Sequence, residues 1–201
     1  MYVPDHFSDQ DSTRAFALMA KYPFGLVITI AEGEPFVSHV PFKIDAEHKR
    51  VMWHLAAANP QAAHLAQGAV TKLVFQGPHA YISPRWYAAM NVPTWNYAAV
   101  HVTGKVTSLD RDSTAELVVA MSRDYEGSAG LGEFESTPRY AAMAMAIRGF
   151  ALQINSLQSK YKLSQNRPLE DQRNVAARLL DSADQPSREL GEMMRAMLND
   201  H

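Results

Sequence analysis

Alternating and continuous runs of apolar residues predict six β-strands along the chain. The segments 24–31 (FGLVITIA) and 35–44 (PFVSHVPFKI) flank Glu32, Gly33 and Glu34, which predicts a hairpin with glycine at its turn. Four further strands are predicted at 50–56, 69–77, 97–109 and 148–163. Strands of mostly antiparallel character, with helices between and after them, favour a closed or split β-barrel with α decoration over a βαβ fold.

Apolar residues at helical spacing predict the helices. The first is expected at about 11–22, with Asp9 or Asp11 as its cap. The others are expected at 60–67, 111–126, about 138–146, 169–182 and 187–199. The last two each carry an apolar stripe. The final stripe is rich in methionine and its helix lacks a basic face, which predicts packing or a dimer contact rather than DNA recognition.

Strand periodicity places three histidines away from the predicted core. Residues two apart on a strand share a face, so Val100 and Val102 point one way and His101 points the other. The same count turns His39 and His54 away from their apolar neighbours. Each imidazole is expected either to line a cleft at a subunit boundary or to be solvated at a strand edge.

The segment 77–104 is unusually rich in aromatic residues for a polar, proline-broken stretch. It holds Trp86, Tyr87, Trp95 and Tyr97, and so two of the three tryptophans of the chain. Such rings suit a planar ligand or a subunit interface. We expect these four side chains to turn away from the core and to form a homodimer interface over 84–97. The alternative is a crossover whose aromatic residues cover the edge of the barrel.

Composition narrows the class of protein. A chain of 201 residues with 47% hydrophobic residues is sufficient for one compact soluble domain. The absence of cysteine excludes disulfides, thiolate metal sites and thiol nucleophiles, and it favours a reducing compartment. No apolar run is long enough to span a membrane, and no basic region followed by an apolar run opens the chain, so we expect a cytoplasmic protein.

The charge balance bears on the partner. The chain has 21 acidic and 19 basic residues, with a formal net charge of −2. Its lysines and arginines are scattered, without the basic stripe of a protein that holds DNA through phosphate contacts. Charge therefore does not support direct DNA binding.

Three separated motifs give the chain a family resemblance. MYVPDHF at 1–7, the aromatic segment 77–104 and YKLSQNR at 161–167 occur in the order found in the PaiB family, described as FMN-binding negative transcriptional regulators. The resemblance implies one FMN-binding split-barrel domain over 1–201, mainly β with α decoration. The barrel would cover about 20–165, followed by a C-terminal helical extension at about 169–199. It also implies a homodimer with the flavin in a cleft between subunits.

A helix start after the strand 50–56 is a candidate phosphate site. Asn59 suits an N-cap and Pro60 the first helical position, so free backbone amides are expected to face an anion. The family usually carries an arginine near position 57 and a bulky aromatic residue near position 62. This chain has Ala57 and Ala62. The loss of the guanidinium predicts weak FMN binding.

The polar segment 161–168 is the second candidate site. Amide side chains match the mixed donors and acceptors of a flavin, and lysine suits its phosphate; the alternative is a polar loop that caps the next helix. The resemblance and strand periodicity together give ten candidate cofactor-binding residues. They are His39, His54, Asn59, Trp95, Asn96, His101, Lys162, Ser164, Gln165 and Asn166.

Motifs for catalysis are absent from the sequence. There is no nucleophile elbow, no HExxH, no GxGxxG turn and no convincing metal site, so the catalytic residues stay unknown. Three functions remain open. The family label implies a transcriptional repressor, flavin chemistry implies an oxidoreductase, and related split barrels imply haem binding with His39, His54 or His101 as axial ligand.

Overall fold

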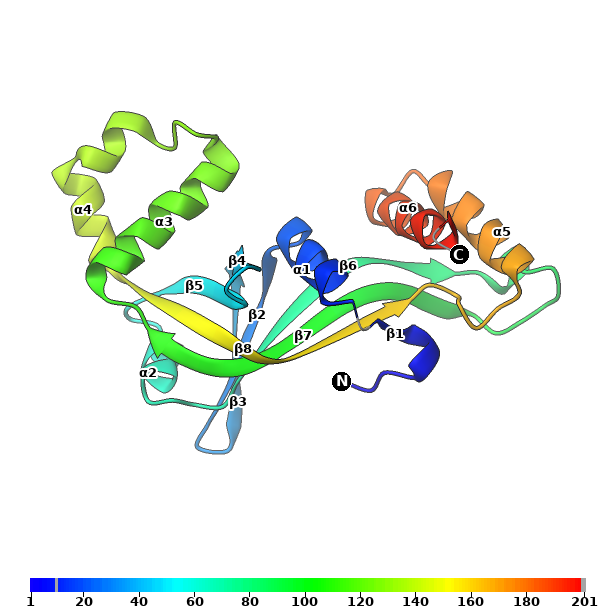
Figure 1. Cartoon of the computed structure of the whole chain (residues 1–201), viewed down its shortest axis with the longest axis horizontal. Coiled ribbons are helices and arrows are strands. Elements are labelled where there is room, and N and C mark those ends of the chain that lie inside the picture. The colour runs from blue at the N-terminus through cyan, green and yellow to red at the C-terminus, as the bar shows by residue number, and fades with distance from the viewer. Residues whose placement is uncertain (10, 200–201) are drawn as a thin grey trace. The chain divides into compact units, whose positions relative to one another are not determined.

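The computed structural model describes residues 1–9 and 11–199, and within them eight strands form one sheet (Figure 1). The strand order is β3-β2-β6-β7-β8-β5-β4, with β1 beside β8. The sheet does not close, because β3 and β4 end the order. The strands are β1 (Ser8–Asp9), β2 (Phe24–Ala31), β3 (Glu34–Pro41), β4 (Lys43–Asp45), β5 (Arg50–Ala56), β6 (Thr71–Ile82), β7 (Thr94–Ser108) and β8 (Ile147–Lys162).

Six α-helices and three short 3-10 helices accompany the sheet in the described residues. They are η1 (Asp5–Phe7), α1 (Ser12–Lys21), α2 (Pro60–Ala66), η2 (Pro84–Trp86), α3 (Arg111–Glu126), η3 (Gly132–Ser136), α4 (Pro138–Ala144), α5 (Leu169–Leu180) and α6 (Gln185–Asn199). All six predicted helices are present, and Asp11 caps the first, since its carboxylate accepts the Thr13 N–H over 2.8 Å. The α+β split-barrel class predicted from the sequence is confirmed.

The sequence predicted six strands, and the described residues form eight. The segment 35–44 divides at Phe42, whose backbone N–H donates to the Pro23 carbonyl over 2.9 Å. Pro41, just before it, has no N–H to give to a ladder. These two features end β3 and let β4 begin as a separate strand. The other addition, β1, has two residues and is too short to show a period; it pairs with β8 at Ser8 and Lys160.

The predicted hairpin is present with a two-residue turn. Ala31 of β2 lies opposite Glu34 of β3, and the residues between them both have positive φ, 53° at Glu32 and 85° at Gly33. Two successive left-handed residues give the twist that a tight hairpin needs. Glycine adopts this conformation without the steric cost of a Cβ.

The chain forms two compact units. Unit 1 comprises the described residues of 1–15, 76–100 and 158–201, and unit 2 comprises 16–75 and 101–157. The core of unit 2 is aromatic. Phe42 packs against Phe75 and Trp53 with ring centroids 4.8 and 5.8 Å apart, and Trp53 stacks on Phe150 at 5.8 Å.

A buried amide fixes α2 to the β2–β3 hairpin in unit 2. The side chain of Gln61 is fully buried, and its Nε2 lies 3.0 Å from the carbonyls of Val27 and Phe36 and 3.2 Å from Thr29 Oγ1. Buried polar groups persist in proteins when they are hydrogen-bonded in this way. This helix is therefore positioned by polar contacts to two strands.

The C-terminal helices α5 and α6 of unit 1 pack against each other (Figure 1). Val175 and Leu179 of α5 and Leu190 and Met194 of α6 are buried, as the predicted stripes require. At Gly191 the helices approach so closely that an added Cβ would lie 2.9 Å from a backbone nitrogen of α5. Within the described residues, no helix is both long and apolar enough to cross a membrane.

Candidate functional site

A lysine near the C-terminal end of β8 joins this strand to the beginning of β7 in unit 1. Lys162 donates from Nζ to Thr94 Oγ1 and to the Trp95 carbonyl, the latter over 2.8 Å. An ammonium group has three N–H donors. The third donor of this half-buried side chain therefore has no protein acceptor among the described residues.

Two further cations lie close to Lys162. Burial, followed by the positive charges of Lys160 and Arg167, lowers the pKa of Lys162. None of the three cations forms an ion pair with a carboxylate in the part of the chain that the structure describes. The three positive charges repel one another, and a bound anion would offset this repulsion. The cluster is thus suited to a phosphate or carboxylate.

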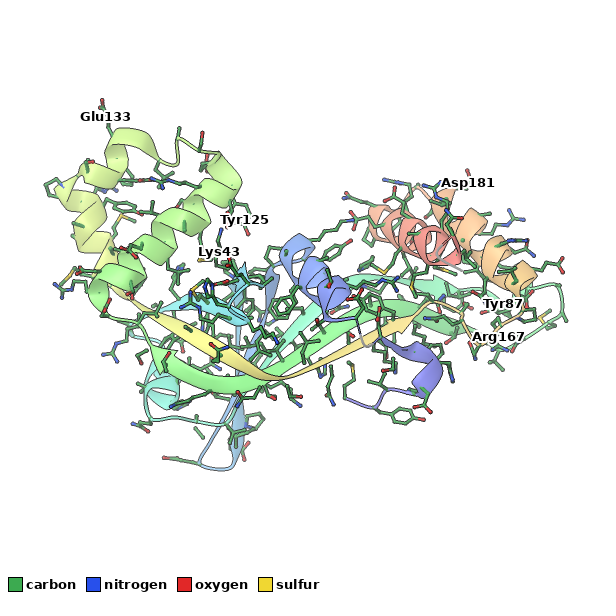
Figure 2. The ribbon with its side chains drawn as sticks, in the orientation of Figure 1. Lys43, Tyr87, Tyr125, Glu133, Arg167 and Asp181 are labelled. Carbon is green, nitrogen blue, oxygen red and sulfur yellow. The ribbon has the colours of Figure 1, made fainter. Side chains whose placement is uncertain are left out.

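Aromatic rings hold the two outer cations of this cluster. The Lys160 ammonium donates to the Tyr2 carbonyl over 3.1 Å and lies 5.3 Å from the centre of the Tyr97 ring. The Arg167 guanidinium covers the ring of Tyr87 at 5.4 Å, and both residues are labelled in Figure 2. Lys160 is buried and Arg167 is half-buried, so burial and cation–π contacts limit the freedom of both side chains.

An exposed aromatic surface lies on the neighbouring strands β6 and β7. Trp95 is 54% exposed, and its ring centroid is 6.1 Å from that of His79 and 6.2 Å from that of Tyr81. Tyr81 is itself 48% exposed. A cluster of open ring faces is a surface on which a planar group can stack. We call these three residues the Trp95 surface.

Asn96 and Ser164 form a buried hydrogen-bonded pair in unit 1. Asn96 is fully buried, and its Nδ2 donates to Ser164 Oγ over 2.9 Å and contacts Met194 Sδ at 3.7 Å. Ser164 has a φ of 67°, a conformation that non-glycine residues rarely adopt. The Asn96 Oδ1 has no donor among the described residues. The pair joins the segment after β8 to β7 and α6.

The side chain of Gln165 forms hydrogen bonds to the backbone of its own turn. Its Oε1 accepts the Leu163 N–H over 2.6 Å, and its Nε2 donates to the Tyr161 carbonyl. The amide expected to meet a flavin therefore has both ends occupied by backbone groups. Asn166 is exposed at the tip of the same turn.

The three histidines predicted to leave the core lie in unit 2. His39 is exposed and stacks on Phe24 with ring centroids 6.4 Å apart. His54 and His101 are half-buried, and burial lowers the pKa of each imidazole. Their Nδ1 atoms have no hydrogen-bond partner among the described residues. Burial therefore favours the neutral form of both rings, which is the form that can bind a metal ion or accept a proton.

The helix start at α2 is present as predicted, but its amides are not free. Asn59 accepts the Gln61 N–H over 2.9 Å, Pro60 has no N–H, and the Ala62 N–H donates to the Asn59 carbonyl over 2.9 Å. Asn59 also donates to Ser38 Oγ over 3.1 Å. The cap satisfies the backbone groups that would otherwise face an anion.

Comparison with known proteins decides the family. Residues 1–156 match the model of the family described as "Putative FMN-binding domain". The chain belongs to this FMN-binding family. It is 34% identical to the Bacillus subtilis "Protease synthase and sporulation protein PAI 2", over 98% of this chain and 98% of the relative. The PaiB resemblance seen in the sequence is thereby confirmed.

Solved structures of low sequence identity share the fold of this FMN-binding family member. A Mycobacterium smegmatis protein titled as FAD and heme binding matches with a TM-score of 0.67 and 16% identity, over 85% of this chain and 79% of that one. The flavocytochrome Anf3 of Azotobacter vinelandii matches with a TM-score of 0.64 and 22% identity, over 85% of this chain and 77% of that one.

The candidate residues of this family member fall into two groups. Unit 1 brings together Trp95, Asn96, Lys162, Ser164, Gln165 and Asn166, and unit 2 holds His39, His54, Asn59 and His101. Within unit 1, Lys162 keeps a free N–H donor and the Trp95 ring is exposed, so these two could contact a ligand. Asn96 is fully buried and Gln165 is internally bonded, so neither offers a free group.

Several features of the site differ from the sequence expectation. Tyr87 does not turn away from the chain, because its side chain is only 7% exposed and lies under Arg167. His79, Tyr81 and Thr94 were missed. For His79 and Tyr81 a signal existed, since they alternate with the apolar Ala80 and Ile82 along a strand that runs five residues past its predicted end.

Proposed function

We propose that this chain binds FMN, with the flavin phosphate at the cation cluster of unit 1. The observation that carries the proposal is the unused Lys162 N–H in a group of three cations without a carboxylate partner among the described residues. A phosphate dianion supplies the acceptor and the opposite charge at once. Membership of the FMN-binding family supports this choice over other anions.

The flavin ring is assigned to the Trp95 surface. The backbone carbonyl of Trp95 accepts a hydrogen bond from Lys162, so the proposed phosphate and ring contacts lie at the same stretch of β7. Bound FMN supplies electron-transfer chemistry, and the task of the chain is to bind the cofactor and orient it. The Lys162 ammonium would bind the negatively charged phosphate of the flavin. The Trp95 indole would offer an apolar face that excludes water from one side of the flavin ring.

We infer that the protein is a homodimer. Exposed apolar side chains occur in both units, with Met90, Val92 and Trp95 in unit 1 at 79%, 63% and 54% exposure. In unit 2, Phe24 and Val70 are 61% and 77% exposed. Soluble monomers rarely leave so much apolar surface open, and a two-fold dimer covers the same patch on both copies.

We also propose a cytoplasmic location, because the absence of cysteine favours a reducing compartment.

Haem binding is the second candidate. Burial lowers the pKa of His54 and of His101, which favours the neutral imidazole that ligates iron, and His39 is exposed. These rings lie in unit 2, so this function would use a different part of the chain from the Lys162 cluster.

An absorbance scan of the purified protein distinguishes the two cofactors. Bound flavin absorbs near about 450 nm and haem near about 400 nm. A protein purified without either is titrated with FMN, with quenching of flavin fluorescence as the signal. Saturable binding at micromolar FMN is expected. A flat titration up to high micromolar FMN together with a saturable haem titration would replace the proposed function by the second candidate.

A further inference from the structure

A pocket in unit 1 lies between η2 and α5 and contains none of the residues assigned to FMN. Its volume is ≈ 560 Å³, which lies within the range of small-molecule clefts. Its lining residues are Arg85, Trp86, Tyr87, Asn174, Ala177, Arg178 and Asp181. Tyr87 and Asp181, labelled in Figure 2, come from its two walls.

One wall is a single face of α5 and its C-cap. Ala177, Arg178 and Asp181 follow Asn174 by three, four and seven residues, which places the four side chains in one row along a helix. Ala177 provides a small, flat position in the middle of the row. The polar residues around it offer an amide, a guanidinium and a carboxylate to a ligand.

The opposite wall is fixed in place by hydrogen bonds. Ser83 Oγ accepts the Arg85 N–H over 3.3 Å and caps η2, and the Asp171 carboxylate accepts the Ala88 N–H over 2.8 Å. Between these two anchors, Tyr87 is buried beneath the Arg167 guanidinium. A wall held at both ends keeps its shape before a ligand binds, which lowers the entropy cost of binding.

The two arginines of the pocket favour a negatively charged ligand. Arg85 and Arg178 are exposed side chains that line the same open pocket, and neither forms an ion pair within the described residues, whereas Asp181 is the only carboxylate among the lining residues. A guanidinium presents paired donors that match the oxygens of a carboxylate or phosphate. The half-buried Trp86 adds an apolar ring face beside them.

We propose that this pocket binds a small organic anion that carries a phosphate or carboxylate group on a flat apolar body. The two arginines hold the anionic group, and Trp86 contacts the body. The site is separate from the one assigned to FMN, since Lys162 and Trp95 are not among its lining residues. The chain would then bind a second acidic ligand beside its cofactor.

Isothermal titration calorimetry on the full chain tests this proposal with phenyl phosphate, benzoate and, as a cation, benzylamine. Phenyl phosphate and benzoate are expected to bind and benzylamine is not. Arg85→Gln and Arg178→Gln should each weaken binding of phenyl phosphate about tenfold or more. Arg173→Gln, an exposed arginine of α5 outside the lining, is the matched control and should leave the affinity unchanged.

Three results would overturn the proposal. The first is no heat of binding for either anion to the wild-type chain. The second is equal affinity in Arg85→Gln, Arg178→Gln and wild type, which places the anion elsewhere. The third is competition by FMN together with weaker FMN binding in Arg178→Gln, which makes the pocket part of the flavin site. Thermal unfolding of each variant confirms that the arginine changes leave the fold intact.

Discussion

The ammonium of Lys162 donates a hydrogen bond to the backbone carbonyl of Trp95 over 2.8 Å. This contact fixes the position of a positive charge next to the strand segment that presents an exposed indole. Its second bond, to Thr94, leaves one donor of the lysine without a protein acceptor among the described residues. The pair therefore places an anion-binding group and a ring-binding group at one point of β7.

Replacing Lys162 by glutamine removes this charge while keeping an amide donor. We expect FMN affinity to fall about tenfold or more, because a hydrogen bond to a charged group contributes about 1.5–3 kcal/mol. Flavin fluorescence titration measures the change. Lys105→Gln, an exposed lysine of β7 in unit 2, is the control and should bind FMN as the wild type does.

Adding a positive charge at position 57 distinguishes two proposed positions of the FMN phosphate, the Lys162 cluster and the start of α2. Ala57 is exposed, so Ala57→Arg adds the guanidinium that the family resemblance led us to expect near this position, without burying it. Tighter FMN binding in Ala57→Arg with unchanged binding in Lys162→Gln would contradict the proposed phosphate position and return it to the start of α2. Loss in Lys162→Gln alone supports the cation cluster.

The dimer proposal predicts that one exposed residue from each unit contributes to assembly. Trp95→Ala and Val37→Asp should both shift the chain towards monomer, because Trp95 is 54% and Val37 45% exposed in the single chain. A stable interface buries about 800 Å² per partner. Light scattering after size exclusion gives the mass. A monomeric wild type at micromolar concentration would refute the dimer, and a dimeric Trp95→Ala chain would remove this tryptophan from the interface.

Acid is expected to destabilise the fold through its half-buried histidines. Burial lowers the pKa of His54, so the unfolded chain takes up the proton first as pH falls below about 6.5. The free energy of unfolding is therefore highest above that pH and declines below it, until the folded state also protonates. Urea unfolding from pH 7.5 to 5 should show a shallower decline for His54→Gln. The exposed His39→Gln serves as control, and equal slopes in both variants would contradict this expectation.

Gln61 is predicted to be essential for stability. In Gln61→Glu, carboxylate oxygens would face the carbonyls of Val27 and Phe36, which the amide now serves at 3.0 Å. A buried charge among acceptors should cost about 3 kcal/mol or more in the free energy of unfolding. Gln67→Glu, exposed just after α2, should change it by about 0.5 kcal/mol or less. Denaturant titration compares the two, and equal stabilities would show that the amide contacts contribute little.

Direct DNA binding is expected to be absent or weak. A chain with a formal net charge of −2 and no basic stripe makes few phosphate contacts. Fluorescence anisotropy with a labelled duplex at low and moderate salt measures this. Nanomolar affinity that falls steeply with salt would overturn the expectation and would establish a repressor that contacts its operator itself.

The fold was largely accessible from local sequence patterns. Helix caps such as Asp11 and the positive-φ turn at Glu32 and Gly33 depend on neighbouring residues, so their positions could be predicted. The division at Phe42 could not, because it depends on a hydrogen bond to Pro23, nineteen residues earlier in the chain by number. Contacts between distant segments leave no periodic signal.

The candidate site was predicted in part for the same reason. Motifs pointed to Lys162 and Trp95, and the structure joins them. Side-chain chemistry alone could not show that Gln165 is used by its own turn or that Asn59 satisfies the amides of α2. Residue type indicates which groups can bind a ligand, whereas only the folded chain shows which of them are already paired.

The way in which the chain passes between its two compact units bears on how such a protein can be divided. It crosses after Ala15, Phe75, Val100 and Leu157, and these points lie inside α1, β6, β7 and β8. No crossing coincides with a loop. A gene fragment therefore cannot encode either unit as one continuous piece, and recombination at any crossing would cut a helix or a strand. Either unit expressed alone would have to be assembled from separate segments of the chain.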